Sequence, residues 1–110
     1  MTEQEFQKHS EESIGSLKRA LYDAEANADF EVEEANGALQ INFEAPPARF
    51  VVSPNSPVRQ IWISALSTSF KLDWSGADAE FVLAKTGESL KKLVARLINQ
   101  QLGCEEIELA

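Results

Sequence analysis

The chain has few of the residues that build covalent or metal-held structure. Its 110 residues include one cysteine, Cys104, and one histidine, His9. A single cysteine excludes an internal disulfide, and one histidine leaves no Cys/His set for a structural zinc site. We therefore expect a reducing compartment, the cytoplasm, and not the setting of a small secreted domain.

Long apolar runs and catalytic motifs are missing as well. The longest apolar runs are only a few residues, whereas a membrane-spanning helix needs about 20. The N-terminal MTEQEF lacks the basic and apolar regions of a signal peptide, so we expect a chain that stays where it is made or has already lost a targeting segment. No GxSxG, HExxH, CxxC or Gly-rich phosphate loop is present. The sequence therefore predicts neither a membrane protein nor an orthodox enzyme.

Positive charge is scarce, and the negative charge is unevenly placed. The chain carries 18 acidic and 10 basic residues, for a net charge of -8. Residues 1–34 hold ten of the acids and three of the basic residues. Such an asymmetry repels the phosphates of nucleic acids and anionic membranes, and it favours cations or a basic protein partner. We therefore expect no nucleic-acid partner and no membrane partner.

Helical spacing is strong at both ends of the chain. Thr2 and Glu5 have the spacing of a capping box, and apolar residues then recur at helical intervals, which predicts a helix over residues 3–24. Gly15 lies inside it at a cost of about 1 kcal/mol relative to alanine, so we expect a close packing point there. A second apolar stripe predicts a helix from Thr86 to the region of Gly103, which would end it.

Between the helices, apolar and polar residues alternate in short segments. The pair Asn36-Gly37 predicts a tight hairpin between the first two of about six strands, and short polar connections imply an antiparallel meander. Two helices with one apolar stripe each would cover one face of this sheet. We therefore expect an α+β fold, a two-layer sandwich with the N- and C-terminal helices packed on one face of an antiparallel sheet.

A tryptophan stands on the other face of the predicted sheet. In QIWIS, Ile61 and Ile63 point to the core, so Gln60 and Trp62 point away from it. In FKLDW, by contrast, Trp74 points inward. An exposed indole either packs on its neighbours in the sheet or anchors a partner protein. The residues alone leave both readings open for Trp62.

The acidic residues near the N-terminus are candidate metal ligands. We expect them to line one edge of the molecule: Glu11, Glu12, Asp23, Glu25, Asp29, Glu31, Glu33 and Glu34. Carboxylate oxygens suit iron, manganese, calcium or magnesium, although scattered exposed ones bind weakly. The alternative is a solvated charged face, partly neutralised by i,i+4 pairs from Lys8 to Glu12 and from Arg19 to Asp23.

Four segments together resemble one protein family. QIWIS, FKLDWSG, TGESL and the leading EFQKHSEESIGSL are similar, in the same order, to segments of the frataxins, and the compact start resembles a bacterial frataxin. The likeness ends near Gly103, which suggests a domain over residues 1–103 and a short tail over 104–110. It implies a two-layer sandwich, iron bound weakly as Fe2+ or Fe3+ through carboxylates, and docking on a cysteine desulfurase and an iron-sulfur scaffold protein.

The resemblance also assigns residues. Seven acids match the acidic ridge of the family: Glu11, Glu12, Asp23, Glu25, Asp29, Glu31 and Glu33. Trp62, with Gln60 before it, matches the sheet tryptophan that meets a partner. Lys18, Arg19 and Tyr22 depart from the pattern where many relatives have acids, and Gln7 replaces an acid or histidine, so the ridge is thinner at its middle.

The function implied by the resemblance is that of a regulatory adaptor. It would bind iron, dock on the desulfurase and the scaffold, and modulate sulfur transfer in an iron-dependent way. The alternatives are an iron storage or chaperone protein with weak ferroxidase activity, and a purely structural acidic domain. We expect a monomer, with iron-driven oligomerisation left open.

Overall fold

The computed structural model of the chain describes residues 1–26, 28–44, 47–103 and 107–109. Cys104 lies outside these residues. The elements in chain order are α1 (Glu3–Glu25), β1 (Phe30–Ala35), β2 (Ala38–Glu44), β3 (Pro47–Asn55), the 3-10 helix η1 (Ser56–Val58), β4 (Gln60–Ala65), β5 (Thr68–Ser75), β6 (Glu80–Leu83), β7 (Glu88–Ser89) and α2 (Leu90–Leu102).

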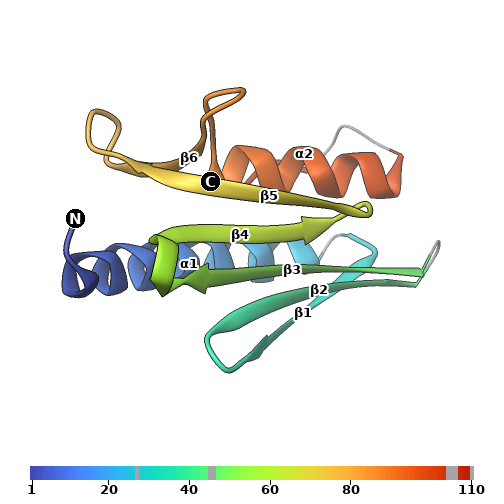
Figure 1. The fold of residues 1–110 in the computed structure, drawn as a ribbon. Helices are drawn as coiled ribbons and strands as arrows, with labels where there is room; N and C mark the ends of the chain where they lie inside the picture. The colour runs from blue at the N-terminus through green and yellow to red at the C-terminus, as the bar shows by residue number, and fades with distance from the viewer. Residues whose placement is uncertain (27, 45–46, 104–106, 110) are drawn as a thin grey trace.

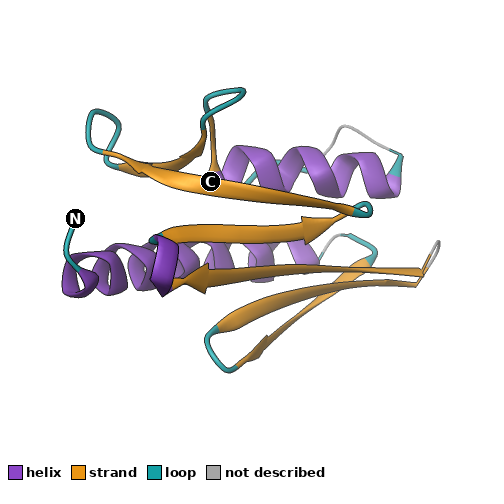
Figure 2. Ribbon diagram, viewed as in Figure 1, coloured by secondary structure: helices purple, strands orange, loops and turns teal. Residues whose placement is uncertain are grey.

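The strands form one antiparallel sheet in the order of the chain, from β1 at one edge to β7 at the other. Both helices lie on the same side of this sheet, behind it in the view of Figure 1 and Figure 2. The expected two-layer α+β sandwich is confirmed. The sheet has seven strands and not six, because the two-residue strand β7 pairs with β6 just before α2.

Helix α1 begins where the capping box places it. The Thr2 hydroxyl accepts the Glu5 N–H at 3.1 Å, and the Thr2 N–H donates to Glu5 Oε1 at 3.1 Å. This backbone donor lowers the pKa of Glu5. The helix continues to Glu25, one residue beyond the expected end. The expected close packing at Gly15 is wrong, because the side-chain atom nearest to an added Cβ would be Nη1 of Arg19, in the same helix, at 3.8 Å.

Helix α2 begins four residues later than the apolar pattern predicts. Gly87 has a φ of +76°, which breaks a helix, and both Thr86 and Gly87 donate their N–H groups to the Leu83 carbonyl in a turn. Ser89 is the N-cap, with its hydroxyl accepting the Lys92 N–H at 3.4 Å. The predicted end is confirmed: Gly103 has a φ of +69° and donates its N–H to the Asn99 carbonyl.

Two tight turns set the register of the meander. Asn36 and Gly37 have φ values of +54° and +80°, which confirms the predicted β1–β2 hairpin. Leu66 and Ser67 adopt the same left-handed region, at +52° and +60°, between β4 and β5. Neither residue favours that region, so the sheet and its packing hold this turn in place.

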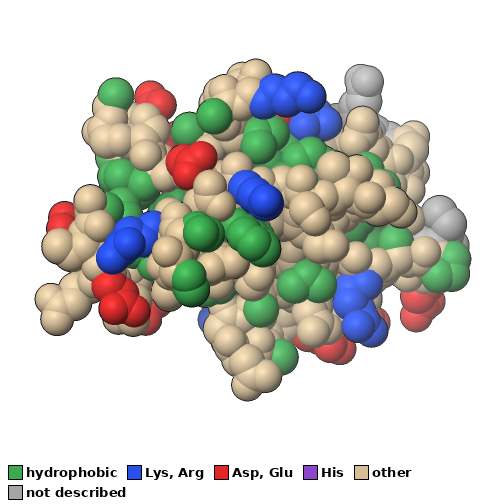
Figure 3. All heavy atoms as spheres, in the orientation of Figure 1, with side chains coloured by type: hydrophobic (Ala, Val, Ile, Leu, Met, Phe, Trp, Pro, Cys, Tyr) green, Lys and Arg blue, Asp and Glu red, His purple; other side chains and the backbone are tan. Residues whose placement is uncertain are grey.

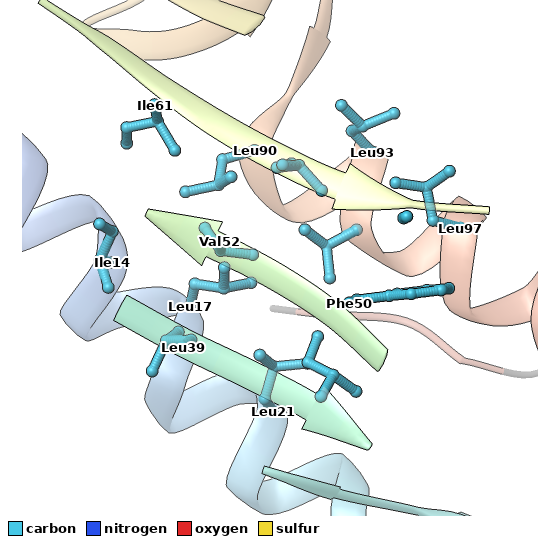
Figure 4. Close-up of a cluster of buried hydrophobic side chains, with 14 of the residues drawn as sticks. Ile14, Leu17, Leu21, Leu39, Phe50, Val52, Ile61, Leu90, Leu93 and Leu97 are labelled. Atoms are coloured by element: carbon cyan, nitrogen blue, oxygen red, sulfur yellow. The ribbon is translucent and has the colours of Figure 1, made fainter. Parts of the chain in front are cut away.

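The core lies between the helices and the inward face of the sheet. Figure 4 shows side chains of α1 and α2 meeting those of the central strands: Ile14, Leu17, Leu21, Leu90, Leu93 and Leu97 from the helices, and Leu39, Phe50, Val52 and Ile61 from the strands. Ile107 and Leu109 pack partly buried against this core. Asn99 holds Ile107 by accepting its N–H at 3.0 Å and donating to its carbonyl at 3.1 Å. Within the described residues, neither helix has the length and apolar character needed to cross a bilayer.

Candidate functional site

Trp62 lies on the sheet face that the helices leave uncovered. The alternation of β4 buries Ile61 and Ile63 and turns Trp62 outward, where its side chain is half-buried by its neighbours on that face. The indole N–H donates to Gln60 Oε1 at 2.9 Å. The Lys71 ammonium lies over the ring, 5.0 Å from its centroid, at cation–π distance. The outward placement predicted from the sequence is therefore confirmed.

A second hydrogen bond extends this arrangement to β5. Gln60 Nε2 donates to Asp73 Oδ1 at 2.9 Å, across the strand pair that places these two residues opposite each other. The same register places Trp62 opposite Lys71. We call these four residues (Gln60, Trp62, Lys71 and Asp73) the sheet-face patch. Figure 3 shows this face, with hydrophobic side chains and a Lys or Arg near its middle and most Asp and Glu nearer its margins.

Sequence reasoning missed Lys71 and Asp73. The feature that would have identified them is the register of the β4–β5 hairpin. In this register Ala65 pairs with Thr68, and the pairing continues along both strands to Trp62 with Lys71 and Gln60 with Asp73. That register follows from a two-residue turn at Leu66-Ser67. A short polar connection was predicted between these strands, but neither residue favours the positive φ of a two-residue turn, so the sequence did not predict the length of the turn or the register that follows from it.

Trp74 lies on the opposite face of the sheet, the one that the helices cover, and its contacts differ from those of Trp62. It points toward the helices, as predicted, but it is half-buried at the end of the sandwich and not deep in the core. The His9 ring of α1 stacks on it at 3.9 Å between centroids with an interplanar angle of 18°. Phe81 meets it edge-on at 5.2 Å. The only histidine of the chain thus packs α1 against β5.

The seven predicted ridge acids do not form one cluster. Glu11 and Glu12 lie on α1, separated from Asp23 by about 17 to 18 Å of helix at 1.5 Å per residue. Glu31 and Glu33 point to the outer face of β1, because Phe30 and Val32 of that strand are buried on the other. We keep the name acidic ridge for Glu11, Glu12, Asp23, Glu25, Asp29, Glu31 and Glu33.

The β1 end of the ridge contains an open groove. Four ridge acids line it together with Asn42 and Glu44 of β2: Glu25, Asp29, Glu31 and Glu33. Glu44 is a further acid that the sequence reasoning missed, although the Asn36-Gly37 turn brings the end of β2 beside the start of β1. Glu25 is already engaged, because its Oε2 accepts the Val32 N–H at 2.6 Å.

The ridge has no ready-made metal cage. Across the part of the chain that the structure describes, no three His, Cys, Asp or Glu side chains are grouped closely enough to hold a metal ion. Separate exposed carboxylates bind hard cations weakly, because several ligands must be brought together at the moment of binding. Iron binding by these carboxylates stays a prediction.

The cations of α1 pair differently from the expectation. Among the described residues, neither Lys8 with Glu12 nor Arg19 with Asp23 forms an ion pair, so both expected i,i+4 pairs are wrong. Lys18 instead reaches across to β1 and donates to Glu34 Oε2 at 3.4 Å. A long side chain can prefer a carboxylate on a neighbouring element over one on its own helix, which a helical spacing rule does not take into account.

The sequence matches known proteins over nearly its whole length. A family model described as a frataxin-like domain matches residues 1–104. The iron-sulfur cluster assembly protein CyaY of Azotobacter vinelandii is 31% identical over 99 residues, which cover 88% of this chain and 88% of that protein. The protein of the same name from Pseudomonas fluorescens Pf0-1 is 28% identical over 81 residues, covering 74% and 73%.

Two solved structures have the same architecture. A frataxin from Psychromonas ingrahamii matches with a TM-score of 0.82 at 16% identity, covering 100% of this chain and 99% of the other. Yeast frataxin matches with a TM-score of 0.67 at 19% identity, covering 91% and 82%. These structural matches support the fold, and the sequence matches support the family. The chain belongs to the frataxin-like family.

Proposed function

We propose that this protein is an iron-responsive adaptor of iron-sulfur cluster assembly that acts in the cytoplasm and docks on a cysteine desulfurase and its scaffold protein. The assembly role is suggested by the names of its relatives. The observation that carries the docking role is Trp62, held by hydrogen bonding on the sheet face opposite the helices. The core is complete without this ring, whereas a tryptophan on a polar surface suits an interface anchor.

The acidic ridge supplies the second contact. Its carboxylates lie along α1 and β1, and the negative potential that they add speeds encounter with a basic protein surface. Glu11, Glu12 and Asp23 are exposed and free of ion pairs within the described residues, so they are available to Arg or Lys of a partner.

Iron enters as a regulator or cargo bound by the same carboxylates. A cation on the ridge neutralises the charge that a basic partner surface needs, so iron and the partner compete for it. Iron storage with ferroxidase activity is less well supported, because it requires closely grouped carboxylates and the described residues contain no such group. The Lys18 ammonium at Glu34 weakens that alternative further.

A binding titration with both partners tests the docking role. Trp62→Ala should weaken the complex with at least one of them by ~2 kcal/mol, about 30-fold, which is the loss that defines a hot spot. Val58→Ala is the control, because Val58 is an exposed apolar side chain that lies in η1 outside the patch. Normal binding of Trp62→Ala to both partners would refute the proposal.

An NMR titration tests the iron site. Fe(II), or Mn(II) as a hard-cation substitute, should broaden signals of residues 11–34 first and leave α2 largely unaffected. Reconstituted cluster formation, measured with and without the protein at several iron concentrations, should then change with iron in a way that the isolated desulfurase and scaffold do not. Uniform broadening along the chain would contradict a ridge site.

A further inference from the structure

We infer that Asp73 is a positioning residue for Trp62, acting through Gln60, and that Lys71 makes the sheet-face patch selective for a protein surface that presents a carboxylate. This inference rests on the docking role proposed for Trp62. It concerns what orients the indole before any partner arrives, and the chemistry that the partner must bring to this face.

The hydrogen-bond chain has only one workable direction. An ionised carboxylate accepts hydrogen bonds and cannot donate, so Asp73 must receive the amide N–H of Gln60. That orientation leaves Gln60 Oε1 free, and an indole N–H can only donate. Asp73 thereby selects the amide orientation that Trp62 requires. Without Asp73, the amide could rotate and present its NH2 to the indole, which would break the bond.

A fixed indole binds more tightly than a mobile one. Ordering a side chain at an interface costs affinity, by roughly 2- to 10-fold for each side chain that must be immobilised. The hydrogen bonds through Gln60 and the Lys71 cation over the ring restrict the Trp62 side chain in the free protein. Part of its conformational entropy is therefore already lost on folding and not on binding. Asp73 therefore contributes to affinity even where a partner does not touch it.

Lys71 determines which kind of partner surface can bind over the Trp62 ring. Its ammonium lies 5.0 Å from the Trp62 centroid, and within the described part of the chain it forms no ion pair, although Asp73 is two positions along the same strand face. A partner seated on the indole must remove water from this ammonium. Burying an unpaired charge is costly, so the partner must supply an acceptor, and a carboxylate is the strongest.

The net charge of the molecule also limits which class of partner can bind the sheet-face patch. A phosphate polymer would also offer acceptors to Lys71, but the net charge of -8 repels a polyanion as a whole. A protein surface can place a single carboxylate beside an apolar contact without such repulsion. The patch and the acidic ridge thus call for opposite charges, a carboxylate at the patch and basic groups at the ridge.

The positioning step can be tested in the free protein. In a 1H-15N spectrum, Asp73→Ala should shift the Trp62 Nε1–H signal and speed its solvent exchange, with the Trp74 indole signal as the internal reference. Asp73→Asn keeps an acceptor oxygen but adds an NH2 donor, which allows either orientation of the Gln60 amide, so it should restore the native signal only in part. Asp78→Ala is the matched control, because its carboxylate accepts from the Ser75 hydroxyl and not from Gln60. An unmoved Trp62 signal in Asp73→Ala would overturn the positioning role.

The selectivity step needs the desulfurase and the scaffold, titrated separately. For the partner that Trp62 binds, Asp73→Ala should weaken affinity 2- to 10-fold. Lys71→Glu should weaken it more than 10-fold, and Lys71→Arg should stay near native, since it keeps the cation. Lys85→Glu, an equal charge change at an exposed site in the β6–β7 turn, should have little effect.

The outcomes separate this inference from the proposed function. Normal binding by Trp62→Ala refutes docking and with it the role of Lys71, while the indole signals still decide whether Asp73 positions the ring. Native or tighter binding by Lys71→Glu, with Trp62→Ala impaired, overturns the carboxylate requirement alone. Binding of a short RNA that Lys71→Glu abolishes would overturn the choice of a protein surface.

Discussion

The two tryptophans offer a direct test of how the faces of the sheet differ. Trp62→Ala removes one neutral hydrogen bond, worth about 1 kcal/mol, and one cation–π contact at an exposed site, worth about 0.5 to 1 kcal/mol. It leaves no cavity in the core, because the ring lies outside it. We expect a loss of about 1.5 to 2 kcal/mol in the free energy of unfolding.

Trp74→Ala should cost more. The ring stacks on His9 and meets Phe81 edge-on, and each aromatic contact is worth about 0.5 to 1.5 kcal/mol beyond burial. The ring also packs against the core, so its deletion approaches the lower end of the ~3 to 5 kcal/mol measured for buried tryptophans. We expect a loss of about 3 kcal/mol.

Thermal unfolding followed by far-UV circular dichroism measures both losses without using tryptophan fluorescence. For a domain of this size, 1 kcal/mol corresponds to roughly 4 °C in Tm. Trp62→Ala should therefore melt about 6 to 8 °C below the native protein, and Trp74→Ala about 12 °C below. The variants Trp62→Phe and Trp74→Phe keep a ring and should recover part of each loss. Equal losses for the two alanine variants, or a larger one for Trp62→Ala, would refute this reasoning.

Three further substitutions test separate parts of the structure. Gly15→Ala should raise the free energy of unfolding by about 0.5 to 1 kcal/mol, since the nearest atom to the new Cβ is 3.8 Å away; destabilisation in urea unfolding would show a packing constraint there. Arg96 holds the pKa of Glu88 below its ordinary value of 4.5, so the ion pair between them stabilises the fold at pH values above 4.5. This stabilisation is lost as the pH falls through the lowered pKa that Glu88 has in the folded protein. Near neutral pH, Glu88→Gln should therefore lower the free energy of unfolding by at most about 1 kcal/mol, seen as a lower Tm, and at low pH by less. A larger loss of stability at low pH than at neutral pH would contradict this pH dependence. Asn99→Ala removes two hydrogen bonds to Ile107 and should cost about 1 to 2 kcal/mol and speed hydrogen exchange of the Ile107 N–H; unchanged exchange would show that other contacts hold this segment.

Much of the fold could be predicted because its causes are local. The capping box of Thr2 and Glu5 places the start of α1, and Asn36-Gly37 places the first hairpin, since each effect acts within four residues of the chain. The alternation of β4 also settles that Trp62 faces away from the core. The same local reasoning was wrong at residues 86–89, where the apolar stripe of α2 was extended through the turn made by Gly87.

The candidate site depended on contacts between elements. Sequence spacing identified Trp62 and the ridge acids. It did not identify Lys71, Asp73 or Glu44, which lie beside them because of the pairing between neighbouring strands. It also predicted ion pairs for Lys8 and Arg19 within α1, which do not form among the described residues, and it missed the pair between Lys18 and Glu34 of β1. The roles of the ridge acids in iron binding stay predictions.

The sequence by itself determined the helices, most strands, the two-layer arrangement and the face on which each tryptophan lies. These follow from periodicity, capping and turn propensity, which depend on neighbours along the chain. Only the tertiary structure decided what surrounds Trp62. The Leu66-Ser67 turn adopts a backbone that neither residue favours, so the packing of the whole sheet holds it, and with it the register that brings Lys71 over the indole and Asp73 to Gln60.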